Sequence, residues 1–182
     1  MSETWLLDAN VISLLFEGDA EAAVERAIAD VMLLATTARV LDEVLRADPR
    51  KRSWVERARA WRTAPPLRVL DMTLGTLVHT RLQANLHRYA PKDLSRLRDN
   101  GEFTCIAHAA EDPSIVLVTY DRNAIWRAIH ELRPLTRVAS ALVFFDTLMQ
   151  RGALDRAARD RLGELASVRD HRPTWWSALP AP

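Results

Sequence analysis

The segment Ile115-Val-Leu-Val-Thr119-Tyr-Asp121 decides the fold class of this 182-residue chain. Its β-branched and apolar residues follow Asp112-Pro113 and end at Asp121, a pattern typical of a buried strand between turns. A helix is predicted directly after it, over about 122–131. The segment Trp5-Leu-Leu-Asp8 has the same form, again with an acid where a strand passes into a helix. Strands that are each followed by a helix predict a parallel sheet.

The remaining elements extend this alternation in both directions. Strands are predicted at about 5–7, 32–35, 67–70, 115–119 and 135–138. Helices are predicted at about 11–16, 20–29, 37–47, 50–62, 73–88, 91–97, 100–111, 122–131, 139–150 and 155–166. About five parallel strands with helices on both faces give an α/β chain with three layers, α/β/α.

The composition indicates one globular domain that does not enter a membrane. Apolar residues make up 48% of the chain, which is enough for one core at this length. The longest uncharged apolar stretch, near 138–145, is far too short to span a bilayer, and the N-terminal MSETW lacks the basic start of an export signal. Cys105 is the single cysteine, so a reducing cytoplasm fits best. The five histidines show no zinc-binding spacing and look incidental.

The net charge of +1 conceals a segregated chain. Residues 1–45 hold nine acidic and two basic residues, whereas residues 46–68 hold eight basic and two acidic ones. Guanidinium groups suit phosphate contacts, so the basic segment is a candidate nucleic-acid surface, formed by Arg50, Lys51, Arg52, Arg57, Arg59 and Arg62. Trp54 and Trp61 share a face of this helix. They either stack on bases or, as we favour, form the core stripe of an amphipathic helix.

Three acidic residues, Asp8, Asp121 and Glu102, can be interpreted either as ligand-binding residues or as helix caps. Asp8 and Asp121 follow strands, at the edge where the ligand sites of α/β sheets form, although Asp is also a common helix cap. Glu102 borders the apolar stripe of its helix. With Asp99 three residues earlier, it also fits a capping box.

The helix predicted over 37–47 carries two adjacent acids, Asp42 and Glu43. They flank its apolar stripe on opposite sides, and helical periodicity does not choose between them. Either acid alone is typical of a solvated charge beside a buried face.

Four motifs, taken in order, resemble the PIN-domain nucleases: LLDANVIS (6–13), TTARVLDEVL (36–45), DNGEFTCIAHAA (99–110) and VLVTYDRNA (116–124). In that family four acids gather over a parallel sheet and bind Mg²⁺ or Mn²⁺. The resemblance implies that the catalytic metal ligands here are Asp8, Glu43, Glu102 and Asp121. It thereby selects Glu43 over Asp42.

The resemblance covers about residues 3–152 and implies a PIN-like nuclease domain over 1–152. Within that domain, a basic helical insertion at about 48–98 distinguishes the chain from compact members of the family. Residues 153–182 add a helix and a tail that we expect to pack on the same domain. Trp175 and Trp176 in this tail either dock on the domain or meet a partner.

The chemistry explains why such acids would need a cation. Two carboxylates about 5 Å apart repel by roughly 3 kcal/mol at an effective dielectric constant of about 20. Mg²⁺ or Mn²⁺ relieves this repulsion, can deliver a hydroxide-like nucleophile to a phosphodiester, and stabilises the leaving oxygen. Neighbouring polar side chains are candidates for holding the four ligands or their waters: Asn10, Asp99, Thr119 and Asn123.

The resemblance implies a metal-dependent endoribonuclease acting on single-stranded or structured RNA, with DNA left open. A narrower interpretation is the toxin of a VapC-type toxin–antitoxin pair, whose partner is an antitoxin protein. Since the family often dimerises, a homodimer is also considered. One alternative is a PIN-like module that binds RNA or protein without cleavage. Another, ranked lower, is a haloacid-dehalogenase-like phosphatase, which normally needs a second Asp where this chain has Asn10.

Overall fold

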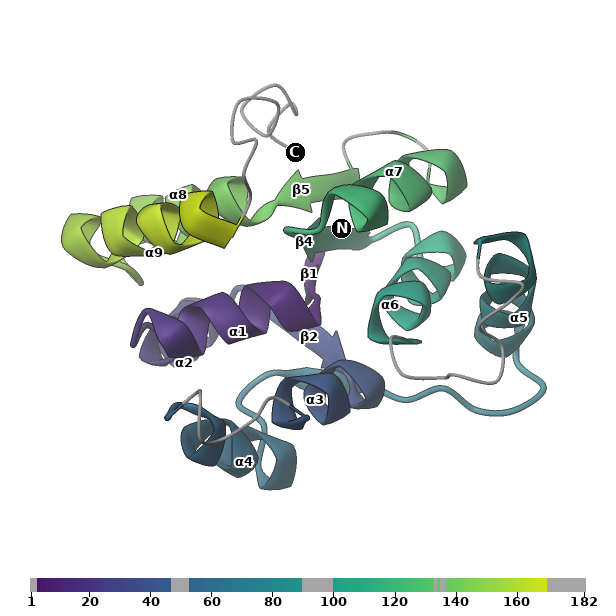
Figure 1. Cartoon of the computed structure of the whole chain (residues 1–182), viewed down its shortest axis with the longest axis horizontal. Helices are drawn as coiled ribbons and strands as arrows, with labels where there is room; N and C mark the ends of the chain where they lie inside the picture. The colour runs from purple at the N-terminus through teal and green to yellow at the C-terminus, as the bar shows by residue number, and fades with distance from the viewer. Residues whose placement is uncertain (1–2, 47–52, 90–99, 133, 135–136, 170–182) are drawn as a thin grey trace.

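The computed structural model describes residues 3–46, 53–89, 100–132, 134 and 137–169. Its centre is a sheet of five parallel strands in the order β3-β2-β1-β4-β5 (Figure 1). The strands are β1 (Thr4–Leu7), β2 (Leu33–Thr37), β3 (Arg68–Leu70), β4 (Ile115–Thr119) and β5 (Val138–Ser140). The predicted α/β class and five-stranded parallel sheet are therefore confirmed.

Helices flank the sheet on both sides. Those within the described residues are α1 (Ala9–Glu17), α2 (Ala22–Ala29), α3 (Ala38–Leu45), α4 (Val55–Thr63), α5 (Leu77–Tyr89), α6 (Asn100–Glu111), α7 (Arg122–Glu131), α8 (Ala141–Gln150) and α9 (Arg156–Arg169). Figure 1 shows α1, α8 and α9 on one side of the sheet and α6 and α7 on the other, with α5 outside α6. This is the three-layer arrangement expected from the sequence.

The order of the strands reverses beside β1. Leu6 of β1 aligns with Ala35 of β2 on one side and with Leu117 of β4 on the other. From β1 the chain adds β2 and then β3 on one side of β1. It then crosses to the other side of β1, where it adds β4 and β5, so the order of the strands reverses between β1 and β4. In open parallel sheets, ligand sites form beyond the carboxyl ends of the strands at this point.

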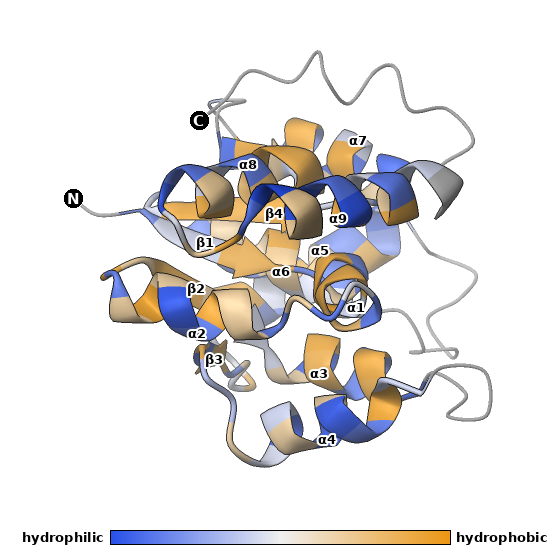
Figure 2. Cartoon of the chain, turned by 90° about the vertical axis from the view of Figure 1, so that its left-hand side faces the viewer, coloured by the Kyte–Doolittle hydropathy of each residue, from blue (hydrophilic) through white to orange (hydrophobic). Residues whose placement is uncertain are grey.

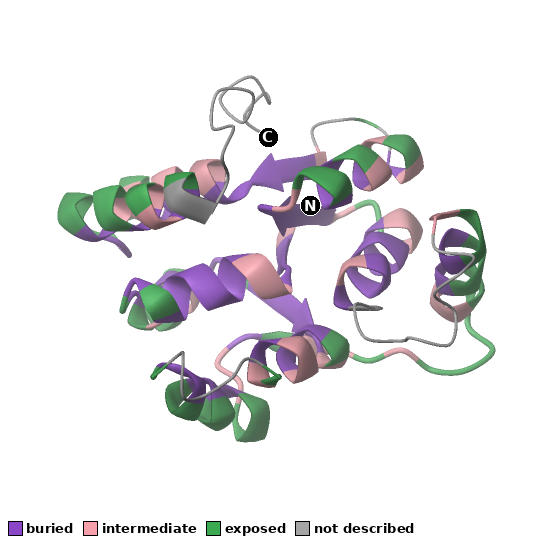
Figure 3. Cartoon of the chain, in the orientation of Figure 1, coloured by how far each residue is buried: buried purple, intermediate pink, exposed green. Residues whose placement is uncertain are grey.

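The core consists of the sheet and the helix faces that cover it. All five residues of β4 are buried, in agreement with its nearly continuous apolar sequence. Figure 2 shows this strand as hydrophobic, and Figure 3 shows that exposed residues lie mainly on the outer faces of the helices.

Trp54 and Trp61 belong to this core. Both are buried, and the ring of Phe16 lies 6.0 Å from Trp54 and 4.8 Å from Trp61, measured between centroids. The core interpretation of the two tryptophans is confirmed, and their interpretation as a base-stacking surface is wrong. Their contacts instead hold α4 against α1.

The fifth strand occupies Val138–Ser140, three residues later than the predicted start at 135. Arg137 fixes the chain ahead of it, because its guanidinium donates to the carbonyl oxygens of Asp112 (2.6 Å) and Ile115 (3.3 Å). Ser140 ends the strand and caps α8 by accepting a hydrogen bond from the Val143 N–H. The helix predicted from 139 therefore begins at Ala141.

Other boundaries shift by one to three residues, and two helices begin four or five residues later than predicted. α5 begins at Leu77 rather than 73, after a segment in which Gly75 has a φ of +82°. α4 begins at Val55 rather than 50. Several predicted features lie outside the described residues, namely the helix at 91–97 and the residues Arg50, Lys51, Arg52, Asp99, Trp175 and Trp176.

The C-terminal helix α9 contacts both α1 and α8. Arg161 donates to the carbonyl oxygen at Gly18 (3.2 Å), which ends α1, and Leu162 is fully buried beside the same glycine. Arg159 pairs with Asp146 of α8 at 2.6 Å. Within the described ranges, no helix combines the length and apolarity needed to cross a membrane.

Candidate active site

Asp8 lies at the end of β1 and caps α1. One carboxylate oxygen, Oδ1, accepts a hydrogen bond from the Val11 N–H (2.9 Å), which satisfies an open donor of the helix. The other, Oδ2, accepts a short hydrogen bond from the hydroxyl of Thr119 at the end of β4. Asp8 is only 3% exposed. The capping interpretation of this residue is thus correct, and the cap also joins the two central strands.

Burial changes the ionisation of Asp8. Loss of water raises its pKa from 3.8 to about 7, with a further contribution from the negative charges of Glu102 and Asp121. The hydrogen bonds from Thr119 and Val11 act in the opposite direction but do not cancel the effect. A bound cation would stabilise the anionic form further, because it would offset both the burial and the neighbouring negative charges.

Asp121 is connected to Asp8 through Thr119. The Asp121 side chain caps α7 by accepting from the backbone N–H groups of Asn123 (2.6 Å) and Ala124 (3.1 Å). Its own N–H donates to the Thr119 hydroxyl oxygen at 3.2 Å. Thr119 is fully buried, so one hydroxyl holds both strand-end acids in place. The structure therefore gives the predicted supporting role of Thr119 a specific geometry.

Glu43 meets the first turn of α6. Its Oε1 accepts a hydrogen bond from the N–H of Gly101 at 2.8 Å. A Cβ at position 101 would lie 2.9 Å from the Glu43 carboxyl carbon and would clash with the carboxylate, so this approach requires glycine. The G-E pair of the motif thus places Glu43 and Glu102 beside each other.

The adjacent acid Asp42 points elsewhere. It forms an ion pair with Arg62 of α4, with a Nε–Oδ1 distance of 3.0 Å. Helical periodicity left Asp42 and Glu43 equivalent, and the structure separates them, with Glu43 directed toward α6 and Asp42 toward α4.

Glu102 forms an ion pair with Arg127 of α7. The distance from Oε1 to the Arg127 Nη1 is 2.7 Å, and the guanidinium also lies 5.0 Å from the centre of the Phe103 ring. Both charged side chains are largely buried, at 21% and 28% exposed. The sequence interpretation did not identify Arg127 as part of the site. The available indication was its position in the helix that directly follows Asp121.

Cys105 shows how closely the acids converge. It is buried one turn after Glu102, and burial raises the pKa of its thiol, followed by the negative charges of Asp8 and Glu43 and, more weakly, Glu102. Together with the influence of Glu102 and Asp121 on Asp8, this indicates that the four predicted acids lie near one another. Oxygen donors of this kind suit Mg²⁺ or Mn²⁺.

In this conformation the four acids are not arranged to coordinate a metal ion together. Among the described residues, no three Asp, Glu, His or Cys side chains are arranged to hold a metal ion. The reason lies in their present partners, because Glu102 faces Arg127 and Glu43 faces the Gly101 N–H. The donor chemistry therefore fits a divalent cation, while the geometry requires side chains to change partners before such an ion binds.

The other predicted side chains are only partly engaged at the site. Asn10 is half-buried in the first turn of α1, and Asn123 is exposed, with only its backbone N–H bound to Asp121. Asp99 lies outside the described residues, so the capping box that it would form with Glu102 stays a prediction.

The described members of the candidate nucleic-acid surface, Arg57, Arg59 and Arg62, all bind acids. Arg57 pairs with Asp19 (2.6 Å) and Glu21 (2.7 Å) and thereby fastens α4 to the start of α2. Arg59 pairs with Glu56 of its own helix, and Arg62 pairs with Asp42. These ion pairs are partly exposed, so the side chains stay accessible to phosphate, although each contact would compete with an existing partner.

Comparison of this chain with protein-family models, with curated proteins and with solved structures gave no match.

Proposed function

We propose that this chain is a metal-dependent endonuclease of the PIN-domain type that cleaves RNA in the cytoplasm. The observation that supports this most strongly is the convergence of Asp8, Glu43, Glu102 and Asp121 beyond the carboxyl ends of β1 and β4. An ionised Asp8, which is buried beside other acids, is costly for the fold, and a bound cation would offset that cost. The position of the four acids at the reversal of strand order is where ligands of open α/β sheets bind.

Each residue has a defined part in this proposal. Mg²⁺ or Mn²⁺, when bound, would activate a water and offset the charge of the scissile phosphate. Asp8 and Asp121 follow adjacent strand ends, and the Thr119 hydroxyl fixes their separation. Glu43 is oriented by the Gly101 N–H. Thus three of the four acids accept hydrogen bonds from neighbouring N–H or hydroxyl groups.

Glu102 pairs instead with the guanidinium of Arg127. We propose that this guanidinium stands in for the missing positive charge when no cation is bound. Release from Glu102 would leave it near the proposed cation site, where a guanidinium suits a phosphate oxygen. Arg127 would then bind the RNA strand rather than the acid.

The direct test is cleavage of labelled single-stranded RNA and DNA by the purified chain with Mn²⁺ or with EDTA. We expect RNA to be cut with Mn²⁺, no cleavage with EDTA, and a loss of about a thousandfold or more in a folded Asp8→Ala variant. Cleavage of DNA alone would contradict RNA as the substrate. Undiminished Mn²⁺-dependent cleavage by Asp8→Ala would contradict the assignment of the active site.

The Glu102–Arg127 ion pair favours one other function, a module of the same type that binds RNA without cutting it. In that case Arg127 would be a permanent partner of Glu102. The chain would then bind RNA with equal affinity in EDTA and in Mn²⁺, and it would cleave nothing. The same incubation, followed by a filter-binding assay, separates the two functions.

The toxin interpretation is a narrower proposal within the nuclease function. It requires an antitoxin that covers the four acids, and a short neighbouring reading frame for a small DNA-binding protein would support it. Co-expression should then restore growth to cells that the nuclease arrests. Sedimentation of the purified chain tests the proposed homodimer.

A further inference from the structure

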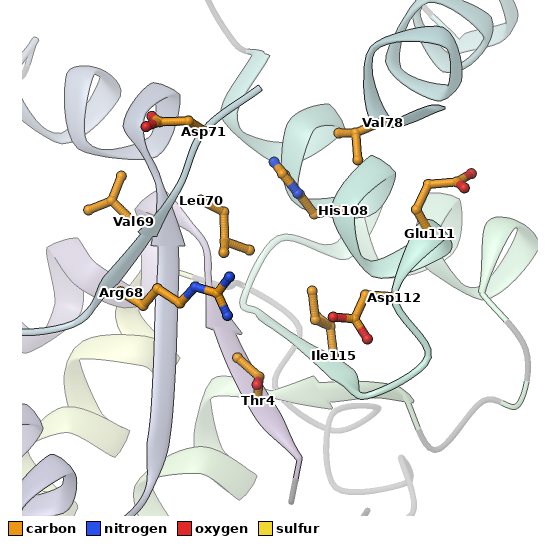
Figure 4. Close-up of a pocket in the computed structure, with 10 residues that line it drawn as sticks. All are labelled: Thr4, Arg68, Val69, Leu70, Asp71, Val78, His108, Glu111, Asp112 and Ile115. Atoms are coloured by element: carbon orange, nitrogen blue, oxygen red, sulfur yellow. The ribbon is translucent and has the colours of Figure 1, made fainter. Parts of the chain in front are cut away.

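A pocket lies at the end of the sheet where the strands begin, opposite the end that carries the four acids. Thr4, Arg68 and Ile115 are the first residues of β1, β3 and β4, and they line a cavity of about 280 Å³ together with residues of α5 and α6 (Figure 4). The candidate active site follows the last residues of the strands instead. Helix α6 reaches both places, with Glu102 in its first turn and His108 near its end.

His108 presents an unsatisfied polar atom in this pocket. Its side chain is only 9% exposed, and its Nε2 has no hydrogen-bond partner among the described residues. Leaving a buried polar nitrogen unpaired costs about 1–3 kcal/mol, so such atoms in native proteins usually meet a partner. Burial, with a further contribution from Arg68, lowers the pKa of His108, which keeps the ring neutral at pH 7. A neutral imidazole has one N–H to donate.

Arg68 supplies a positive charge to the same space. Figure 4 shows its guanidinium between Leu70 and Thr4, turned toward Ile115. Within the described part of the chain, Arg68 forms no ion pair. Its five N–H donors are thus available to a ligand.

Two of the three acids that line the pocket are already bound, and the third, Asp71, turns its carboxylate away from Arg68 and His108 (Figure 4). Glu111 pairs with Arg81 at 3.0 Å. Asp112 accepts hydrogen bonds from the N–H (2.9 Å) and hydroxyl (2.7 Å) of Ser114, and these bonds lower its pKa. The open hydrogen-bonding capacity of the pocket therefore consists mainly of donors, those of Arg68 and His108.

We propose that this pocket binds a small organic acid, with its carboxylate on Arg68 and the Nε2–H of His108. A planar carboxylate matches the fork of a guanidinium. Its single negative charge equals that of Arg68, whereas a phosphate dianion would add uncompensated charge beside Asp112. The apolar body of the ligand would lie against Leu70, Val78 and Ile115, which line the same cavity. The volume limits the ligand to a small molecule.

The test uses 3-methylbutanoate as the probe and its amide, 3-methylbutanamide, as the neutral control of the same shape. Titrations are followed by the nitrogen chemical shifts of the histidine rings in the full chain. We expect saturable, millimolar binding of the acid that moves the His108 signals and assigns the proton to Nε2. The amide should bind at least tenfold more weakly.

Two variants with the same change of charge make the result specific. Arg68→Gln should weaken binding of the acid at least tenfold, while Arg151→Gln, which breaks an ion pair with Asp30 among residues that do not line the pocket, should change it less than threefold. Equal binding of acid and amide would overturn the proposal. So would unchanged binding by Arg68→Gln, or stronger binding of inorganic phosphate than of the acid.

Discussion

The carboxylate of Glu43 rests on the backbone N–H of Gly101, 2.8 Å away and fifty-eight positions along the chain. This contact joins α3 to the first turn of α6 and sets Glu43 beside Glu102. It exists because residue 101 has no Cβ, since a methyl group there would overlap the carboxylate.

Gly101→Ala should therefore disable the site. The added methyl displaces the flexible end of Glu43 and crowds Val40, so we expect a loss of Mn²⁺ binding and a smaller gain in stability than an unhindered helical Gly→Ala change gives in urea unfolding. Gly163→Ala in helix α9 is the matched control, because its Cβ would make only ordinary contacts, with the end of Arg159 at 3.4 Å and with Leu142 at 4.0 Å. That variant should gain about 0.5–1 kcal/mol. Equal stability changes in both variants would contradict the role of the Glu43–Gly101 contact.

Asp8 should make the metal-free protein less stable as pH rises. Its pKa is about 7 in the folded chain and 3.8 as a model group, so the folded state holds the extra proton between these values. The stabilisation is complete below about pH 4 and is lost as pH rises through about 7. It amounts to about 4 kcal/mol at most, at about 1.4 kcal/mol per pKa unit.

Asp8→Asn should remove this dependence while keeping the helix cap, because an amide oxygen also accepts from the Val11 N–H. The measurement is urea unfolding in EDTA at pH 5, 7 and 9. We expect the wild-type chain to lose stability relative to the variant across this range. Parallel curves for the two proteins would show that the Asp8 carboxyl is not perturbed.

Thr119→Val should loosen both strand-end acids, because it removes the hydroxyl that donates to Asp8 and accepts from the Asp121 N–H. The shape is conserved, so the expected loss of about 1–2 kcal/mol in unfolding free energy reports the hydrogen bonds. Thr119→Ser keeps the hydroxyl and should retain Mn²⁺ binding. If Thr119→Ser lost Mn²⁺ binding as fully as Thr119→Val, packing rather than the hydroxyl would be responsible.

Arg127→Gln should tighten Mn²⁺ binding about threefold to tenfold, because the guanidinium no longer competes for Glu102. Calorimetric titration with Mn²⁺ measures this directly. The matched control is Arg88→Gln. This change breaks an ion pair with Glu131, the last residue of α7, and should leave the Mn²⁺ affinity unchanged. Weaker binding in Arg127→Gln would mean that Arg127 positions Glu102 as a ligand instead of competing for it.

The sheet was predictable because its strands carry strong local signals. The run 115–119 is β-branched, buried throughout and bounded by turn residues, and its prediction matched β4 residue for residue. The fifth strand lacked such a signal. Its limits depend on Arg137, whose bonds reach backward to Asp112 and Ile115, and on Ser140, which serves as a cap.

The site was only partly predictable, because its contacts join distant segments. Periodicity placed Asp42 and Glu43 symmetrically, and their separation depends on Arg62 of α4 for one and Gly101 of α6 for the other. Arg127 and His108 belong to no sequence motif that indicates a function. The significance of His108 arises from the position of Arg68 on β3, which no pattern in the helix itself could indicate.

Mn²⁺ binding by single-acid variants tests the central claim most directly. We expect the wild-type chain to bind Mn²⁺ in a calorimetric titration, and Glu43→Gln to bind it at least tenfold more weakly. Asp42→Asn, a change at the neighbouring acid that faces Arg62, should bind as the wild type does. Equal effects of the two substitutions, or no Mn²⁺ binding by the folded wild-type chain, would contradict the proposed cation site.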